Sequence, residues 1–200
     1  MDDLGEAIFA NEHSRMKRKA LVIGLVVFGL VMGFVQEKTK VSLNFIIDAA
    51  AQSTSWDDLD VQNRVQVLNE FRRFRPSEYY SNHEPIEFYL NYSKKQLATM
   101  KWLLLGIWVL VFWVINYFLL RVAFGRTKVL SYLHWGQGLL LLIGGATFGL
   151  AKATGTMSQG YGVARELIGG VQSMIPAFIL GVGYLLFQRI EDDKKNFRSE

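Results

Sequence analysis

Seven polar side chains interrupt the long apolar tracts of this 200-residue chain, and their types decide what chemistry those tracts can support. A polar group is costly inside a lipid bilayer, so one that is kept there is a functional candidate by default. An imidazole can relay protons or ligate a metal, and amides and hydroxyls can hydrogen-bond between helices. The seven residues are Asn116, Ser131, His134, Gln137, Thr147, Gln172 and Ser173.

None of these seven side chains carries a fixed charge, and this absence excludes several classes of membrane protein. Ion-coupled transporters and proton-driven motors usually place an Asp, Glu or Lys within the membrane, and the apolar tracts hold none. His134 has no carboxylate partner there, so an interhelical hydrogen bond is favoured over a metal site. The chain has no cysteine and no Gly-x-Ser-x-Gly turn, and His13 and His83 fit no metal spacing. We therefore expect a protein that is not an enzyme, with no catalytic residue, metal or cofactor.

A run of alternating arginine and phenylalanine lies outside the apolar tracts. Such a run can bind phosphates and stack on bases, but arginines at a helix end near an anionic membrane surface explain it better. We expect it to contact lipid or a protein partner and do not expect nucleic acid as a partner. The residues are Phe71, Arg72, Arg73, Phe74 and Arg75.

Pairs of small residues recur at a spacing of four within the apolar tracts. Small residues on one helical face let two helix backbones approach closely. Twelve of the eighteen glycines fall between Gly136 and Gly183, so close packing is expected for the last two tracts. The motif serves contacts within one chain and contacts between copies equally well. The pairs are Gly29 with Gly33, Gly145 with Gly149, and Ala177 with Gly181.

Four apolar tracts position these residues, and they predict an all-α membrane protein with four transmembrane helices and a helical extramembrane cap between the first and second spans. A span needs about 20 mostly apolar residues, and half of this chain is hydrophobic while 20% is charged. The expected order is a cytoplasmic N-terminal segment with an amphipathic pattern (1–19), a first span (20–35), an external helical region (36–101), a second span (102–120), a basic cytoplasmic loop (121–128), a third span (129–151), an external loop (152–166), a fourth span (167–188) and a charged cytoplasmic tail (189–200). Pro176 and the pair Gly169 and Gly170 favour a kink in the fourth span.

Basic residues set the expected orientation. Arg15 and the run from Lys17 to Lys19 precede the first span, and Arg121, Arg126 and Lys128 lie in the second connection, which has no acidic residue. Both places should face the cytoplasm, because Lys and Arg concentrate on that side. The first tract ends without a small-x-small cleavage pattern, so we expect a retained anchor rather than a signal peptide. The expected location is a bacterial cytoplasmic (inner) membrane with both termini in the cytoplasm.

The region between the first two spans has a helical pattern. Its first helix is expected to start near Ser55 and Asp58, which form a possible capping box, and to end at Pro76. One apolar stripe is expected on it, from Val61, Val65, Leu68 and Phe71. A second helix is expected to start within 81–85 and to continue into the second span, and residues 41–52 are expected to prolong the first span.

These patterns favour a non-enzymatic integral membrane subunit or scaffold of a multiprotein complex of the secretion, conjugation, envelope-assembly or defence type. Its cap and its glycine-rich spans would serve assembly, because some sixty residues bury little surface by themselves. The expected partners are the lipid bilayer, other membrane subunits or further copies, and a cytosolic protein that receives a signal. The alternative is a small oligomeric channel or carrier whose path is lined by Asn116, His134, Gln137, Gln172 and Ser173.

Overall fold

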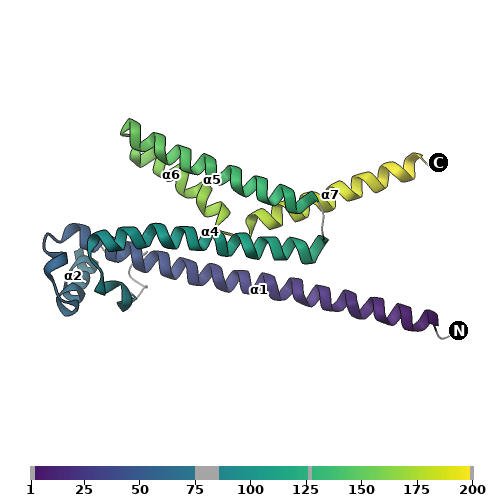
Figure 1. The fold of residues 1–200 in the computed structure, drawn as a ribbon, viewed down its shortest axis with the longest axis horizontal. Coiled ribbons are helices and arrows are strands. Elements are labelled where there is room, and N and C mark those ends of the chain that lie inside the picture. The colour runs from purple at the N-terminus through teal and green to yellow at the C-terminus, as the bar shows by residue number, and fades with distance from the viewer. Residues whose placement is uncertain (1–2, 75–85, 126–127, 199–200) are drawn as a thin grey trace. The chain divides into compact units, whose positions relative to one another are not determined.

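The computed structural model describes residues 3–74, 86–125 and 128–198, although not the side chains of 3–14, 74, 157–161 and 191–198. Every regular element in these ranges is helical (Figure 1), which confirms the predicted fold class. The α-helices are α1 (Asp3–Gln52), α2 (Val61–Phe74), α4 (Lys94–Phe124), α5 (Lys128–Thr154), α6 (Met157–Val171) and α7 (Ile175–Arg198). Two short 3-10 helices, η1 (Trp56–Asp58) and η2 (Glu87–Asn91), flank α2 in the sequence.

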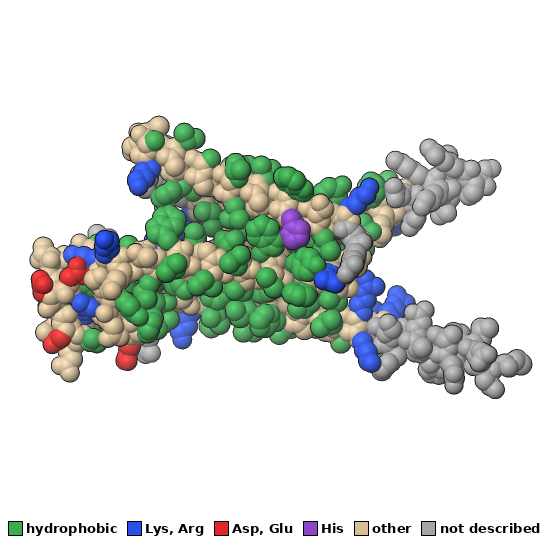
Figure 2. All heavy atoms as spheres, viewed as in Figure 1, with side chains coloured by type: hydrophobic (Ala, Val, Ile, Leu, Met, Phe, Trp, Pro, Cys, Tyr) green, Lys and Arg blue, Asp and Glu red, His purple; other side chains and the backbone are tan. Residues whose placement is uncertain are grey.

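Three of these helices are long and apolar enough to cross a membrane. They are α1 over Arg15–Gln52, α4 and α5. Neither α6 nor α7 meets this test alone, but the two together do if they are counted as one bent span, which would give a fourth crossing. Large hydrophobic side chains remain exposed along these helices, Trp135 most of all at 77%, and Figure 2 shows hydrophobic side chains over their surface. Such surface indicates contact with lipid, because soluble proteins rarely expose apolar patches of this extent.

The chain divides into two compact units, which we call the bundle unit and the cap unit. The bundle unit comprises Met1–Leu30 and Val109–Glu200, and the cap unit comprises Val31–Trp108. Helices α1 and α4 each contribute a part to both units. Residues 3–14, expected to form an amphipathic segment of their own, are continuous with α1.

A helical hairpin of α5 and α6 dominates the bundle unit, where the two helices lie side by side (Figure 1). The turn between them contains Gly155, whose φ of 73° is a conformation that favours glycine. A Cβ added at Gly144 would lie 3.2 Å from Ile168, so glycine allows the two helices to approach closely here. The segment 152–166, expected to be a loop, is instead the end of α5, a tight turn and most of α6, and its external side stays a prediction.

The predicted fourth span is interrupted. Helix α6 ends at Val171, helix α7 begins at Ile175, and the two helices meet at an angle of 63°. The expected kink is confirmed, but it is a complete break over Gln172, Ser173 and Met174. Pro176 lies in the first turn of α7, where its missing N–H costs nothing, whereas in a continuous helix the same residue would remove a hydrogen bond.

The hydrophobic core of the bundle unit joins α1, α4, α5 and α7. Its buried members are Leu119, Leu120, Val129, Leu133 and Ala177, and partly buried residues of α1 pack against them. Arg18 of α1 donates hydrogen bonds to the carbonyls of Val122 and Ala123, both at 2.6 Å. These carbonyls belong to the last turn of α4 and lack partners within their own helix, so a cation stabilises this helix end.

The cap unit has a second hydrophobic core around Trp56, which is fully buried. The other buried members are Leu43, Phe45, Ile46, Ala49, Ala50, Leu68, Phe71, Tyr89, Leu90 and Leu97. These residues come from α1, α2, η2 and α4, so residues 41–52 prolong the first tract as a helix, as expected. Burial raises the pKa of the Tyr89 phenol above its ordinary value of 10.0. Segments distant in sequence thus form one folded region.

The start of α2 differs from the expected one. Ser55 precedes η1 without a side-chain capping bond, and the cap of α2 is Asp60, whose carboxylate accepts the N–H of Asn63 at 2.8 Å. The apolar stripe is also rotated: Leu68 and Phe71 are buried, while Val61 and Val65 are 41% and 38% exposed. Burial of Arg64 one turn before Leu68 explains the rotation, because it turns the face of Val61 and Val65 outward. Pro76, the expected end of this helix, lies outside the described residues.

The second span extends outward into the cap unit, as expected, but its helix α4 starts only at Lys94. The expected start at 81–85 lies outside the described residues, and η2 is followed by a fresh helix start at Ser93. The Ser93 hydroxyl accepts the N–H of Gln96, and the Gln96 side chain accepts the N–H of Ser93 at 2.9 Å. This reciprocal pair is a capping box, and it fixes the beginning of α4 eight residues before Trp102.

Candidate functional site

The break between α6 and α7 is where the structure brings the candidate polar residues together. Asn116 of α4 is fully buried, and its Nδ2 donates a hydrogen bond to the backbone carbonyl of Ser173 at 2.8 Å. Its Oδ1 is buried and has no hydrogen-bond partner within the described part of the chain. One side of this amide therefore stabilises the break, and the other side is buried without a partner among the described residues.

Gln137 of α5 is 1% exposed, and neither its Oε1 nor its Nε2 has a hydrogen-bond partner among the described residues. Polar groups buried without partners are rare in natural proteins, because each loses its hydration without compensation. His134, three residues earlier on α5, is exposed. Only Gln137 of this pair faces the interior.

Contacts on either side place Gln137 opposite the break. Along α5, Gln137 lies between Gly144, which is close to Ile168 of α6, and Leu133, which packs in one cluster with Ala177 of α7. On the returning chain, the break over 172–174 lies between the same two contact points. Gln137 and Asn116 therefore both lie near the interrupted backbone of the bundle unit.

The residues of the break itself are held by local bonds. The hydroxyl of Ser173 donates to the carbonyl of Gly170 at 2.7 Å and accepts the N–H of Ile175 at 3.2 Å. Gln172 is 4% exposed, and its N–H donates to the carbonyl of Ile168 at 3.0 Å. Ser173 bonds to another helix through its backbone carbonyl, which accepts from Asn116, whereas its hydroxyl bonds only to residues near it in sequence. We call Asn116, Gln137 and residues 172–174 the polar layer.

His134 takes part in a separate group of aromatic residues. The indole N–H of Trp113 donates to His134 Nδ1 at 2.7 Å, which confirms the expected hydrogen bond between helices. The ring of Tyr117 stacks on the imidazole with centroids 5.7 Å apart, and Arg121 donates to the Tyr117 hydroxyl at 3.0 Å. Aromatic and cationic side chains in this arrangement are typical of the boundary between lipid and water. Two candidates remain. Ser131 is exposed, and the hydroxyl of Thr147 donates to the carbonyl of Ile143 within its own helix.

The small-residue pairs divide by position. Ala177 is buried, and a Cβ added at Gly181 would lie 3.3 Å from Phe124, so this pair packs against α4. A Cβ at Gly29 would overlap the side chain of Met174 in the break. By contrast, a Cβ at Gly145 or Gly149 would meet no atom within 4 Å in the described parts of the chain. Within one chain Gly144 makes the close approach, and the packing expected of Gly145 and Gly149 is not seen. Gly33 is partly buried.

The arginine and phenylalanine run is partly a core element. Phe71 is 6% exposed and its ring lies 5.6 Å from that of Phe45, so its assignment to a lipid or partner contact is wrong. Arg72 lies over the Phe45 ring at 5.4 Å, and Arg73 is exposed. The side chain of Phe74 and all of Arg75 lie outside the description. Phe71 continues the buried face of α2, which explains its place.

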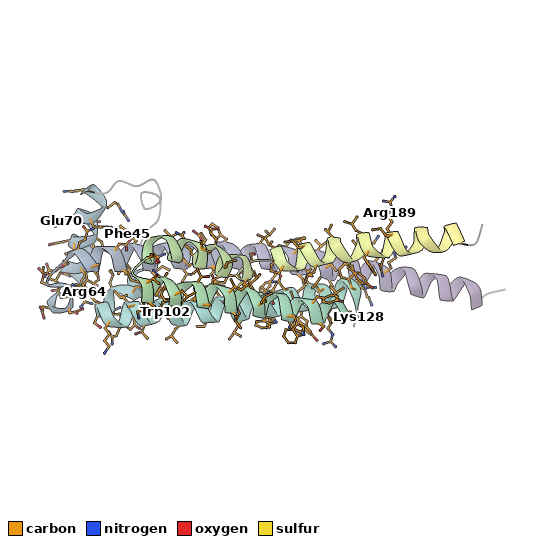
Figure 3. The ribbon with its side chains drawn as sticks, turned by 90° about the horizontal axis from the view of Figure 1, so that it is seen from above. Phe45, Arg64, Glu70, Trp102, Lys128 and Arg189 are labelled. Atoms are coloured by element: carbon orange, nitrogen blue, oxygen red, sulfur yellow. The ribbon has the colours of Figure 1, made fainter. Side chains whose placement is uncertain are left out.

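Arg64 is the polar residue of the cap unit that the sequence did not single out. It is 7% exposed, lies over the Trp56 ring at 5.3 Å, and is labelled with Phe45 in Figure 3. Its guanidinium donates to the carbonyl of Trp56 at 3.1 Å, of Leu90 at 2.6 Å and of Tyr92 at 3.2 Å. Five N–H donors in a fixed plane suit such a task. The one available signal was its position, one helical turn before Leu68.

The residues of the polar layer are uncharged, and what they offer is hydrogen bonding. No cluster of three or more His, Asp or Glu side chains suited to a metal ion occurs in the ranges that the structure describes. Comparison with known proteins gave no match to a family model, to a curated protein or to a solved structure.

Proposed function

We propose that this protein is a non-enzymatic integral membrane subunit of a multiprotein complex, in which the cap unit is a rigid platform for a protein partner. The observation that carries the proposal is the use of Arg64. The buried guanidinium of the cap unit is bonded to the protein's own carbonyls, where it holds η1, η2 and α2 together. Because its N–H groups already donate to these carbonyls, we assign the Arg64 guanidinium to stabilising the cap unit and not to binding a substrate.

The outer face of α2 is the surface we assign to the partner. Val61 and Val65 are spaced by one helical turn and are both exposed, while the opposite face packs in the core. An exposed apolar pair on the outer face of a helix that packs in the core is suited to a helix or loop of another protein. In this proposal both termini are cytoplasmic, the cap unit is external, and the membrane is a bacterial inner membrane.

The test is gentle extraction of the tagged full-length protein, followed by mass spectrometry of the proteins that accompany it. We expect a defined set of membrane proteins that is lost in the double variant Val61→Lys, Val65→Lys. Gln62→Lys, Gln66→Lys is the matched control, because both glutamines are exposed on the same helix. A protein that emerges alone, or partners that ignore the valine variant, would contradict the proposal.

A small channel or carrier is the second candidate, and the polar layer is the observation that favours it. Transporters often place their binding site at a broken helix, where backbone groups are freed near the middle of the membrane. Solute flux through purified protein in liposomes that disappears in Gln172→Ala would favour this function. Silent liposomes together with a stable partner would favour the subunit.

A further inference from the structure

Three buried polar atoms of the polar layer have no hydrogen-bond partner among the described residues: Asn116 Oδ1, Gln137 Oε1 and Gln137 Nε2. The orientation of the Asn116 amide is fixed, because its Nδ2 donates to the carbonyl of Ser173. The layer therefore presents two acceptors and one donor next to an interrupted backbone. Buried groups of this kind are nearly always satisfied in a native protein.

We propose that the polar layer binds a small uncharged molecule that both donates and accepts hydrogen bonds, and water is the smallest molecule of this class. Such a molecule donates to the two amide oxygens and accepts from Gln137 Nε2. It bridges α4 and α5 at the level where α6 gives way to α7. The binding of this molecule in the bundle unit does not rest on the assembly role proposed for the cap unit.

The chemistry of the layer favours a neutral ligand over an ion. None of the residues of the polar layer carries a charge that could balance one. A hard cation takes about six oxygen ligands, and the described side chains of the layer supply two unpartnered oxygens. An ion without a full shell in a medium of low dielectric constant costs far more free energy than a hydrogen-bonded neutral molecule.

The last turn of α6, directly before the break, contains two glycines that no described side chain packs against closely. A Cβ added at Gly169 or Gly170 would meet no atom within 4 Å in the described ranges, although both residues are partly buried. The final carbonyls of a helix have no partners within it, and in this turn the carbonyls of Ile168 and Gly170 accept from Gln172 and Ser173 of the break. Water molecules that bridge such groups are a regular part of protein interiors.

Thermal unfolding of the full-length protein in detergent micelles tests the proposal through the sign of a shift. Gln137→Met keeps the size of the side chain and removes both polar groups. If a bound molecule bridges the layer, the variant loses that bridge and its Tm falls by roughly 3 to 8 °C. If Gln137 has no partner, the variant removes an unpaired buried amide and its Tm rises, which overturns the proposal. Ser131→Ala, at an exposed site of the same helix, is the control and should leave the Tm unchanged.

Nuclear magnetic resonance of protein labelled with nitrogen-15 in its glutamines identifies the ligand. The side-chain amide signal that is missing in Gln137→Met belongs to Gln137. A cross-peak from this amide to water identifies water, and a cross-peak to carbon-bound protons that are not from the protein identifies an organic solute. Either result supports the proposal. An amide signal with neither cross-peak overturns it, whatever the Tm of the variant.

Discussion

Arg64 in the cap unit and Gln137 in the bundle unit are both buried, at 7% and 1% exposed, yet their surroundings differ completely. Arg64 donates to carbonyls of η1, η2 and the segment after it, whereas both polar atoms of Gln137 lack a partner among the described residues. The first arrangement consumes its hydrogen-bonding capacity in holding a shape. The second leaves the hydrogen-bonding groups of Gln137 unused within the described chain, and this is the basis of the ligand that we propose for the polar layer.

The largest expected effect tests whether Arg64 supports the cap unit. Arg64→Ala removes the donor of the buried Leu90 carbonyl, one of the donors to the carbonyls of Trp56 and Tyr92, and the guanidinium that packs on the Trp56 ring. We expect the free energy of unfolding of the cap unit to fall by about 4 kcal/mol. Amide hydrogen exchange of η2 and α2 in the full-length protein measures this loss. Arg73→Ala is the control, since Arg73 is exposed on the same helix. Unchanged protection in Arg64→Ala would remove the contrast between the two units.

A smaller effect is expected at the break in the bundle unit. Gly29→Val places a branched side chain against Met174, and overpacking of this kind costs about 2 kcal/mol. Gly24→Val on the same helix is the matched control, because a Cβ there meets no atom within 4 Å in the described ranges. Thermal unfolding followed by tryptophan fluorescence compares the two variants. Equal Tm values would mean that the break is loosely packed against α1.

The smallest effect sharpens the description of the cap unit. The hydroxyl of Ser42 accepts the N–H of Ile86 at 2.7 Å, and Ser42 is 1% exposed. Ser42→Ala leaves this N–H without a partner, so we expect a loss of about 1 kcal/mol, measured as faster exchange of the Ile86 amide. Thr99→Ala removes a hydroxyl that bonds only within its own helix and serves as the control. Equal exchange of the Ile86 amide in Ser42→Ala and Thr99→Ala would show that the Ser42 hydrogen bond contributes little to the stability of the cap unit.

Part of the candidate site was readable from the sequence. Asn116, Gln137, Gln172 and Ser173 stood out because polar residues are rare in apolar tracts, and all four are buried or partly buried near the break. His134 stood out for the same reason but faces outward, since residue type does not say which side of a helix packs. Phe71 was assigned both to the apolar stripe of its helix and to a lipid or partner contact. Its place is in the core, where it continues the buried face of α2.

The sequence by itself determined that the chain is helical and has tracts long enough to cross a membrane, because length and hydropathy are properties of a segment alone. It also placed the kink near Pro176, since proline acts on its own helix. Only the tertiary structure decided that 152–166 turns tightly into α6, that Arg64 is buried, and that Gln137 lies opposite the break. These facts depend on which helix faces pack together, and that choice is made by contacts between residues far apart in the chain.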